Sequence, residues 1–178
     1  KKKKQEDRIR LGIARTFQQV QLFPEYTLEE NLLMSCRPDH FLKFFYYAAA
    51  EKEKVRSMLL FSHFYEDRHK KLKDMPFGIR RLIQVTCSAI AEPSFLLLDE
   101  PGAGLNFQEI ERLNRLLLKI QQRFGTGILM IDHNMDLVMG ISEKIHVLAD
   151  QKILATGTPQ EIRSNELVLK AYLGDQHA

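Results

Sequence analysis

The chain has 178 residues, of which 44% are hydrophobic and 28% charged, and its net charge is +3. This length suits one domain, or one core with a subdomain, and the composition excludes a collagenous, low-complexity or disordered chain. The mild net charge gives no argument for a nucleic-acid partner. The longest apolar stretches, such as LKFFYYAAA (42–50), are far shorter than the roughly 18 residues that a membrane span needs.

The basic start of the chain and its two cysteines exclude further classes of protein. The opening KKKKQEDR is basic, but acids follow at once and no apolar stretch does, so we expect a solvated helix end rather than a signal peptide or a phosphate-binding arm. Cys36 and Cys87 have no CxxC spacing. They suit reduced thiols in a cytosolic protein rather than a metal or redox site.

The first third of the chain predicts one strand followed by a helical segment. GIARTF (12–17) has the pattern of a strand. In YTLEENLLMSC, Thr27 is the expected N-cap and Glu30, three positions on, completes a capping box. The helical pattern then continues to about Leu72, which indicates an all-helical insert.

Five aromatic residues crowd one part of this insert, and two interpretations of them stay open. They form either the core of the helical segment or an exposed docking patch, because large apolar patches usually mark interfaces. The residues are Phe41, Phe44, Phe45, Tyr46 and Tyr47.

From Gly78 onward, helices and strands alternate. The predicted helices are 78–91, 107–124 with Asn106 as its cap, 135–141 and two short ones at the end; the strands are 95–100, 127–132, 143–150 and 152–157. The last two strands form a hairpin through Asp150 and Gln151. This alternation predicts an α/β fold with a parallel sheet.

Two acids end the apolar run of FLLLDEPGAGLN (95–106). The run predicts a strand buried on both faces, and Asp99 and Glu100 at its carboxyl end make an acidic crevice that needs a cation, such as Mg²⁺ on a nucleotide phosphate. ILMIDHN places Asp132 and His133 after a second apolar strand. Because ligands gather at the carboxyl ends of parallel strands, we expect His133 to face the same crevice as Glu100 and to contact a γ-phosphate rather than to be structural.

The order of TFQQ, FGIRR, LLLDEPGAGLN, MIDHN and ATGTPQEIRSN closely resembles the ATP-binding subunits of ABC transporters. The pattern is most similar to the branched-chain amino acid importers and their lipopolysaccharide-exporter relatives. This resemblance implies a P-loop NTPase core with a mainly parallel sheet plus an all-helical subdomain. It divides the chain into 1–24 (strand and Q-loop), 25–77 (helical subdomain ending in the signature loop) and 78–178 (the rest of the core).

The resemblance also implies ATP and Mg²⁺ as cofactors and gives four residues a role at them. Gln18 matches the Q-loop glutamine, which touches Mg²⁺ or water and links to the membrane subunit. Asp99 matches the metal-holding Walker B aspartate and Glu100 the general base, while His133 matches the switch histidine. The implied partners are transmembrane permease subunits and a second nucleotide-binding subunit, identical or different, at the inner face of the cell membrane, on its cytoplasmic side.

The signature loop departs from the family pattern. Met75 to Ile79 stands where LSxGQ or LSGGQ belongs, with Pro76 at the Ser position and Ile79 at the Gln position, while Gly78 keeps its type. In the family this loop contacts the ATP of the opposite subunit, and Asn106 is similar to the end of the D-loop. Both a competent and a degenerate signature loop stay open.

None of the nine glycines falls in a GxxxxGK[ST] pattern, which in this family lies upstream of the Q-loop. We therefore expect the chain to be the C-terminal majority of a nucleotide-binding domain, and expect the isolated chain to bind ATP poorly and to hydrolyse it negligibly. The predicted function is that of a transport ATPase subunit. The alternatives are a diverged ABC-type module that binds or regulates a partner, and an ABC-type ATPase acting on nucleic acid, against which the absence of a strongly basic face argues.

Overall fold

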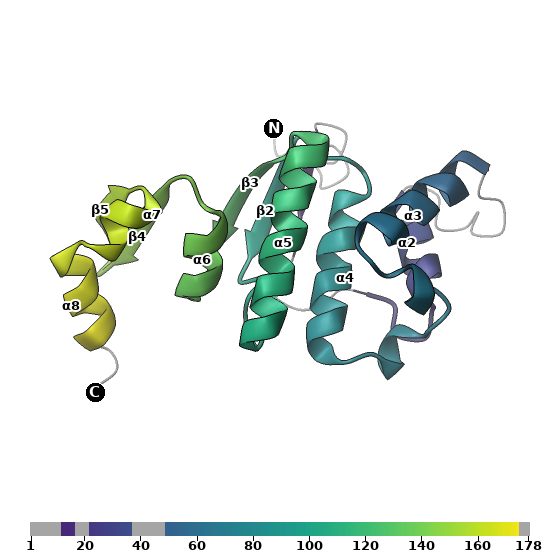
Figure 1. The fold of residues 1–178 in the computed structure, drawn as a ribbon, viewed down its shortest axis with the longest axis horizontal. Coiled ribbons are helices and arrows are strands. Elements are labelled where there is room, and N and C mark those ends of the chain that lie inside the picture. The colour runs from purple at the N-terminus through teal and green to yellow at the C-terminus, as the bar shows by residue number, and fades with distance from the viewer. Residues whose placement is uncertain (1–11, 17–21, 37–48, 175–178) are drawn as a thin grey trace. The chain divides into compact units, whose positions relative to one another are not determined.

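The computed structural model describes residues 12–16, 22–36 and 49–174, and the chain divides into two compact units, Lys1–His133 and Asn134–Ala178. Among the described residues, the first unit holds a three-stranded parallel sheet in the order β1 (Ile13–Arg15), β2 (Phe95–Asp99), β3 (Gly127–Ile131). Figure 1 labels β2 and β3 of this sheet. The predicted α/β class with a parallel sheet is confirmed.

The register of this sheet decides which loops meet at its edge. Asp99, the last residue of β2, lies opposite Ile131, the last residue of β3. Both strands run in the same direction, so the residues that follow them leave the sheet side by side. The turn after Asp99 and the pair Asp132 and His133 are therefore neighbours at the carboxyl edge.

Two long helices pack on the sheet and on each other. They are α4 (Phe77–Ala89), which precedes β2, and α5 (Phe107–Phe124), which connects β2 to β3. The apolar stripe of α5 has helical spacing and is buried, as in Leu113 and Ile120. Gly125 ends α5 in the left-handed conformation, with φ 64°, as is usual for a helix C-cap.

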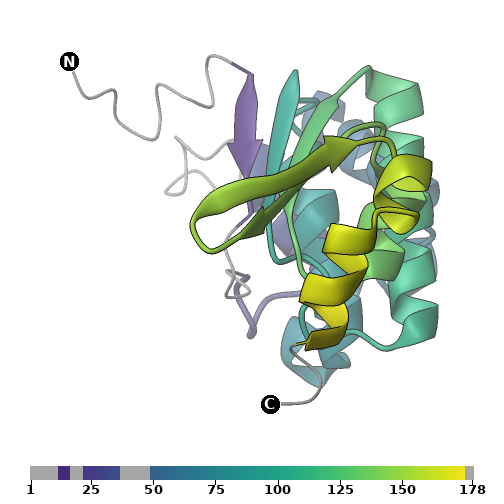
Figure 2. The same cartoon turned by 90° about the vertical axis from the view of Figure 1, so that its left-hand side faces the viewer.

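The prediction that strands β2 and β3 are buried on both faces is wrong. Leu96 and Leu98 are buried, but Phe95, Leu129 and Ile131 are 55%, 63% and 66% exposed. Side chains alternate between the two faces of a sheet, and the described helices α4 and α5 lie on one side of it (Figure 2). An unbroken apolar run therefore predicted more burial than these helices provide.

The helical segment is built as the capping box predicts. Helix α2 (Leu28–Cys36) begins after Thr27, whose N–H donates to Glu30 Oε2 at 2.7 Å while the Glu30 N–H donates to Thr27 Oγ1 at 3.3 Å. Helix α3 (Ala49–Phe61) contacts α2, and Val55 of α3 and Leu28 of α2 are both fully buried. The five crowded aromatic residues, 41 and 44–47, lie outside the described residues, so both interpretations of them stay predictions.

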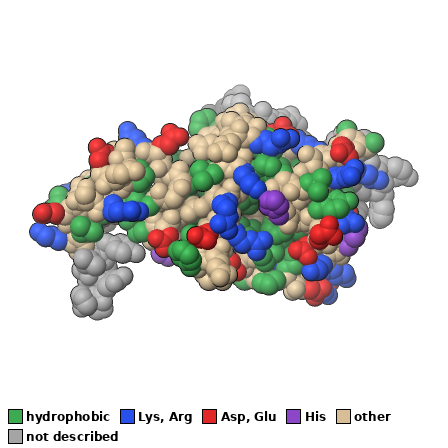
Figure 3. Space-filling model, in the orientation of Figure 1, with side chains coloured by type: hydrophobic (Ala, Val, Ile, Leu, Met, Phe, Trp, Pro, Cys, Tyr) green, Lys and Arg blue, Asp and Glu red, His purple; other side chains and the backbone are tan. Residues whose placement is uncertain are grey.

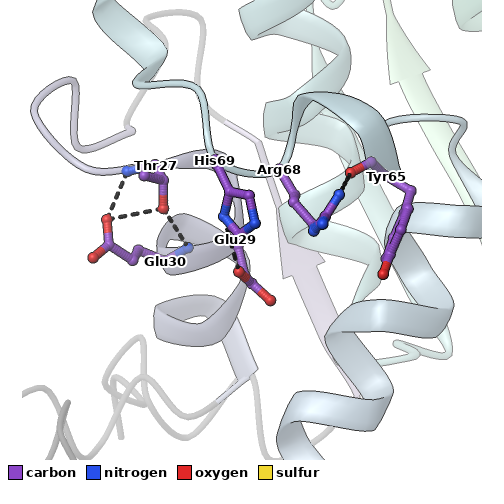
Figure 4. A network of polar contacts seen from close by, with 6 residues as sticks. All are labelled: Thr27, Glu29, Glu30, Tyr65, Arg68 and His69. Carbon is purple, nitrogen blue, oxygen red and sulfur yellow. Dashed lines mark hydrogen bonds and ion pairs between the residues drawn. The ribbon is translucent and has the colours of Figure 1, made fainter.

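Short turns tie the end of this segment back to its start. The 3₁₀ turns η2 (Tyr65–Asp67) and η3 (Leu72–Asp74) follow α3. His69 Nδ1 lies 3.7 Å from the Glu29 carboxylate, and Arg68 donates to the Tyr65 carbonyl at 2.8 Å (Figure 4). Backbone hydrogen bonds from the Leu28 N–H to the Lys70 carbonyl at 3.1 Å and from the Glu29 N–H to the Arg68 carbonyl at 3.0 Å hold this segment against the first turn of α2.

The second unit is a small α/β layer with its own core. It contains α6 (Met135–Ile141), the antiparallel strands β4 (Ile145–Ala149) and β5 (Lys152–Gly157), α7 (Pro159–Arg163) and α8 (Glu166–Gly174). The predicted hairpin is confirmed, with Asp150 and Gln151 at φ 48° and 62°. The core consists of Ile145, Ile162 and Val168.

Acidic and basic side chains are interspersed on the face drawn in Figure 3, with hydrophobic side chains between them. In the part of the chain that the structure describes, no helix combines the length and the apolar character needed to cross a membrane.

Candidate functional site

The turn that follows β2 carries Glu100 in an unusual backbone conformation. Its φ is +44°, which residues with a Cβ rarely adopt. The Glu100 N–H donates to the Ile131 carbonyl at 2.8 Å, and the Glu100 carbonyl accepts from the Ala103 N–H at 3.2 Å. The predicted base therefore sits in a tight, hydrogen-bonded turn at the carboxyl edge of the sheet.

Asp99 lies beside an arginine from the neighbouring strand. Arg15 NH2 donates to Asp99 Oδ2 at 3.1 Å, and the two side chains are 50% and 38% exposed. Exposed pairs of this kind contribute about 0–1 kcal/mol. The Asp99 carboxylate is thus accessible at the site edge, and a divalent cation could replace Arg15 at little cost.

Asp132 and His133 follow β3 and have opposite environments. The Asp132 side chain is fully buried, and its Oδ2 accepts from the Gly102 N–H at 2.7 Å. His133 is 76% exposed, with its Nδ1 4.0 Å from Asp132 Oδ1. The structure therefore brings Glu100 and His133 to one edge, where Asp132 fixes the turn between them.

Arg81 is a site residue that the sequence analysis missed. It is 2% exposed on α4, and its NH2 donates to the Glu100 carbonyl at 2.9 Å while its NH1 donates to Gln84 Oε1 at 3.3 Å. Burial lowers the pKa of Arg81, and the carboxylates of Asp132, Glu100 and Asp99 oppose that shift. Because arginine starts from so high a pKa, it stays a cation. The sequence did contain one indication of this role, because Arg81 and Gln84 are a polar pair on the otherwise apolar, buried face of a helix.

These arginines correct the predicted charge of the crevice. The sequence predicted an acidic crevice at the carboxyl end of β2. Arg15 and Arg81 instead lie among the carboxylates of Asp99, Glu100 and Asp132. The electrostatic repulsion toward a polyphosphate is accordingly smaller than the two adjacent acids alone indicate.

The start of α4, where the signature loop is expected, faces α5. Pro76 is the N-cap and provides no side-chain hydrogen bond. Gly78 is buried, and a Cβ built on it would collide with the Glu109 carboxylate. The carboxylate of this same chain thus lies against the positive end of α4, where anions are stabilised.

Asn106 has a defined structural role in the next loop. Its side chain accepts from the Glu109 N–H, and the Glu109 carboxylate accepts from the Asn106 N–H, both at 3.0 Å. This capping box begins α5, as the predicted cap requires. The nucleotide-contact role of Asn106 and of Gly78 stays a prediction, and Gln18 lies outside the described residues.

The described residues fit a magnesium ion that is coordinated mainly by the phosphates of a bound nucleotide. Within residues 12–16, 22–36 and 49–174, no three His, Cys, Asp or Glu side chains are grouped to hold a metal. Mg²⁺ does not need such a cage, because one or two carboxylates plus phosphate oxygens and water complete its shell. The accessible Asp99 carboxylate suits that arrangement.

Comparisons with known proteins identify the family of the chain. The family model described as "ABC transporter" matches residues 1–103, and the model described as "Branched-chain amino acid ATP-binding cassette transporter" matches residues 152–178. The high-affinity branched-chain amino acid transport ATP-binding protein LivG of Escherichia coli K12 is 36% identical over 176 residues, which cover 93% of this chain and 69% of LivG. The lipopolysaccharide export system ATP-binding protein LptB of Acidithiobacillus ferridurans is 31% identical, covering 96% of this chain and 68% of LptB.

The fold has a close match among solved structures. The ADP conformation of MJ1267, an ATP-binding cassette of an ABC transporter, superposes with a TM-score of 0.82 at 24% identity, covering 97% of this chain and 72% of MJ1267. The predicted P-loop NTPase fold class is confirmed by this match and by the parallel sheet. From the family models, the LivG similarity and the shared fold together, the chain belongs to the ATP-binding domains of the ABC transporter family.

Proposed function

We propose that this chain is the ATP-binding subunit of a transporter for a small solute, with branched-chain amino acids as the first candidates. The proposal rests mainly on the position of Glu100 and His133, which both lie at the carboxyl edge of the sheet, just after the ends of β2 and β3. Similarity to LivG over 93% of the chain supports the choice of solute.

Glu100 is the proposed general base. Its carboxylate would take a proton from the water that attacks the γ-phosphate in line with the leaving oxygen. His133, exposed at the same edge, would donate a hydrogen bond to the γ-phosphate as negative charge develops on it. Gln18 would contact Mg²⁺ or the water.

Asp99 is the proposed magnesium ligand, through the carboxylate that pairs with Arg15. When bound, Mg²⁺ would neutralise charge on the β- and γ-phosphate oxygens. Gly78 and Asn106 would face the nucleotide of a second nucleotide-binding subunit, identical or different. The other partners would be transmembrane permease subunits, with this chain peripheral on the cytoplasmic face of the cell membrane.

One observation favours a second candidate function, a diverged module without ATPase activity: Pro76 replaces the signature serine, which removes a hydroxyl and a backbone donor. Separately, these 178 residues contain no GxxxxGK[ST] pattern, so the lysine and amide nest that hold phosphates are not among them. We therefore expect the isolated chain to bind ATP weakly and to hydrolyse it negligibly.

The test uses a version of the protein that includes a phosphate-binding loop upstream of residue 1. Glu100→Gln should lower its turnover by about 10²- to 10⁴-fold, the usual share of a general base, while ATP binding persists. Arg112→Gln, at an exposed position of α5, is the matched control and should leave turnover unchanged. Near-normal hydrolysis by Glu100→Gln would refute the assignment, and an inactive parent protein that still binds its partners would favour the diverged module.

A further inference from the structure

The backbone of Glu100 is held in a conformation that it would not choose by itself. A φ of +44° is unfavourable for a residue with a Cβ and persists only where the surroundings enforce it. The direction of the Cα–Cβ bond depends on this angle. The contacts that hold φ at Glu100 therefore also set the direction in which its side chain leaves the backbone.

Arg81 is the charged group that reaches this backbone from another element. Its NH2 donates to the Glu100 carbonyl at 2.9 Å, across 19 residues of sequence. The same carbonyl accepts from the Ala103 N–H at 3.2 Å, and the Glu100 N–H donates to Ile131 at 2.8 Å. The peptide groups on both sides of Glu100 are thus fixed, one by β3 and one by α4.

The guanidinium is itself well fixed. Arg81 is 2% exposed and Gln84, which accepts from its NH1 at 3.3 Å, is 5% exposed. The fully buried Asp132 carboxylate attracts Arg81 and also accepts from the Gly102 N–H at 2.7 Å. Arg81 and Asp132 therefore hold opposite parts of one turn, from α4 and from the end of β3.

We propose that Arg81 is a positioning residue that holds Glu100 in the left-handed conformation and so directs its carboxylate. The base would then depend on α4, the helix whose start carries residues 75–79. A conformational change at the start of α4 would be transmitted to Glu100 through the Arg81 guanidinium. This inference rests on the proposed role of Glu100 as the general base.

The first experiment measures amide hydrogen exchange by mass spectrometry on the 178-residue chain without ligand. Arg81→Lys keeps the charge opposite Asp132 but loses the fork that donates to both Gln84 and Glu100. Exchange within residues 100–104 should rise about 10-fold or more, since a hydrogen bond from a charged donor contributes about that factor. Peptides from α5 should exchange as in the parent chain, and so should all peptides of the control Arg112→Lys.

A second variant covers the case in which Arg81→Lys does not fold. Gln84→Leu leaves Arg81 in place but removes the acceptor that orients it, and should raise exchange in the same segment by a smaller factor. Unchanged exchange at residues 100–104 in whichever of these variants folds would overturn the proposal. An equal rise in every peptide would also overturn it, because the arginine would then support the whole fold rather than this turn.

The second experiment measures turnover in the version of the protein with a phosphate-binding loop. Arg81→Lys should lower kcat by about 10- to 100-fold, as small displacements of a catalytic group do, with KM for ATP unchanged. In a Glu100→Gln background the same substitution should have little further effect, because both act through one carboxylate. An undiminished effect there would overturn the positioning role and leave Glu100 as the base. Normal turnover of Glu100→Gln alone would instead refute the proposed function, while the exchange result stands by itself.

Discussion

The carboxylate of Glu109 occupies the space that a side chain at Gly78 would need. A Cβ added to Gly78 would lie 2.6 Å from Glu109 Oε2, well inside van der Waals contact. The carboxylate cannot move away freely, because it accepts from the Asn106 N–H in the capping box of α5. Glycine at this position is therefore explained by packing between α4 and α5, before any contact with nucleotide is considered.

Gly78→Ala should consequently lower the free energy of unfolding by about 1–3 kcal/mol, the usual range for overpacking. In an unobstructed helix the same change would stabilise by about 1 kcal/mol, so the sign is diagnostic. Chemical denaturation of the chain measures it. In the double variant with Glu109→Ala the loss should shrink, since the colliding carboxylate is gone. A stabilising Gly78→Ala in the parent chain would contradict the close approach.

Replacing Asn106 separates its structural role from a nucleotide role. Asn106→Ala should cost about 1 kcal/mol of stability, because the Glu109 N–H loses its acceptor. Asn106→Ser keeps a capping oxygen and should retain most of the stability. If Asn106 also contacts nucleotide, the serine variant should turn over ATP more slowly at nearly full stability. Equal stability of the alanine and parent chains would show that this cap contributes nothing.

The exposed His133 gives a catalytic prediction with little effect on the fold. His133→Ala should lower turnover by about 10²-fold or more in the version of the protein with a phosphate-binding loop, because a donor to the developing charge is lost. The melting temperature should stay unchanged, since the side chain is 76% exposed. His69→Ala, at another exposed histidine, is the control and should change neither quantity. Normal turnover of His133→Ala would remove this residue from the site.

The two thiols should react at very different rates. Burial raises the pKa of Cys87 to about 12, whereas Cys36 is half-buried at the end of α2. At pH 8 only about one in ten thousand Cys87 side chains is a thiolate, and the thiolate is the reactive form. Iodoacetamide should therefore label Cys36 in the folded chain and Cys87 only after unfolding, as peptide mapping can show. Fast labelling of Cys87 in the folded chain would contradict its burial.

Sequence patterns predicted the local structure well because local chemistry decides it. Thr27 with Glu30, and Asn106 before an amphipathic stretch, fixed two helix starts. The hairpin at Asp150 and Gln151 also followed from short-range turn preferences. For these elements, each residue's partner lies within a few positions, so one sequence contains the whole argument.

The parts that sequence reasoning missed depend on distant partners. Arg81 and Glu100 are 19 residues apart, and Arg15 and Asp99 are 84 apart, so no local pattern pairs them. The burial of β2 and β3 was overestimated for a related reason. An apolar run reports the preference of a strand for burial, but the elements that cover each face are set by the whole fold.

The exposed face of β2 and β3 has a consequence for how the chain behaves at different concentrations. Phe95, Leu129 and Ile131 offer apolar area that any suitable surface can cover, and each Å² covered contributes about 25 cal/mol. Whatever binds this face in the folded state stabilises that state by mass action. If copies of the chain associate there, the measured free energy of unfolding will rise with protein concentration, so a dilution series is needed to obtain the value for the single chain.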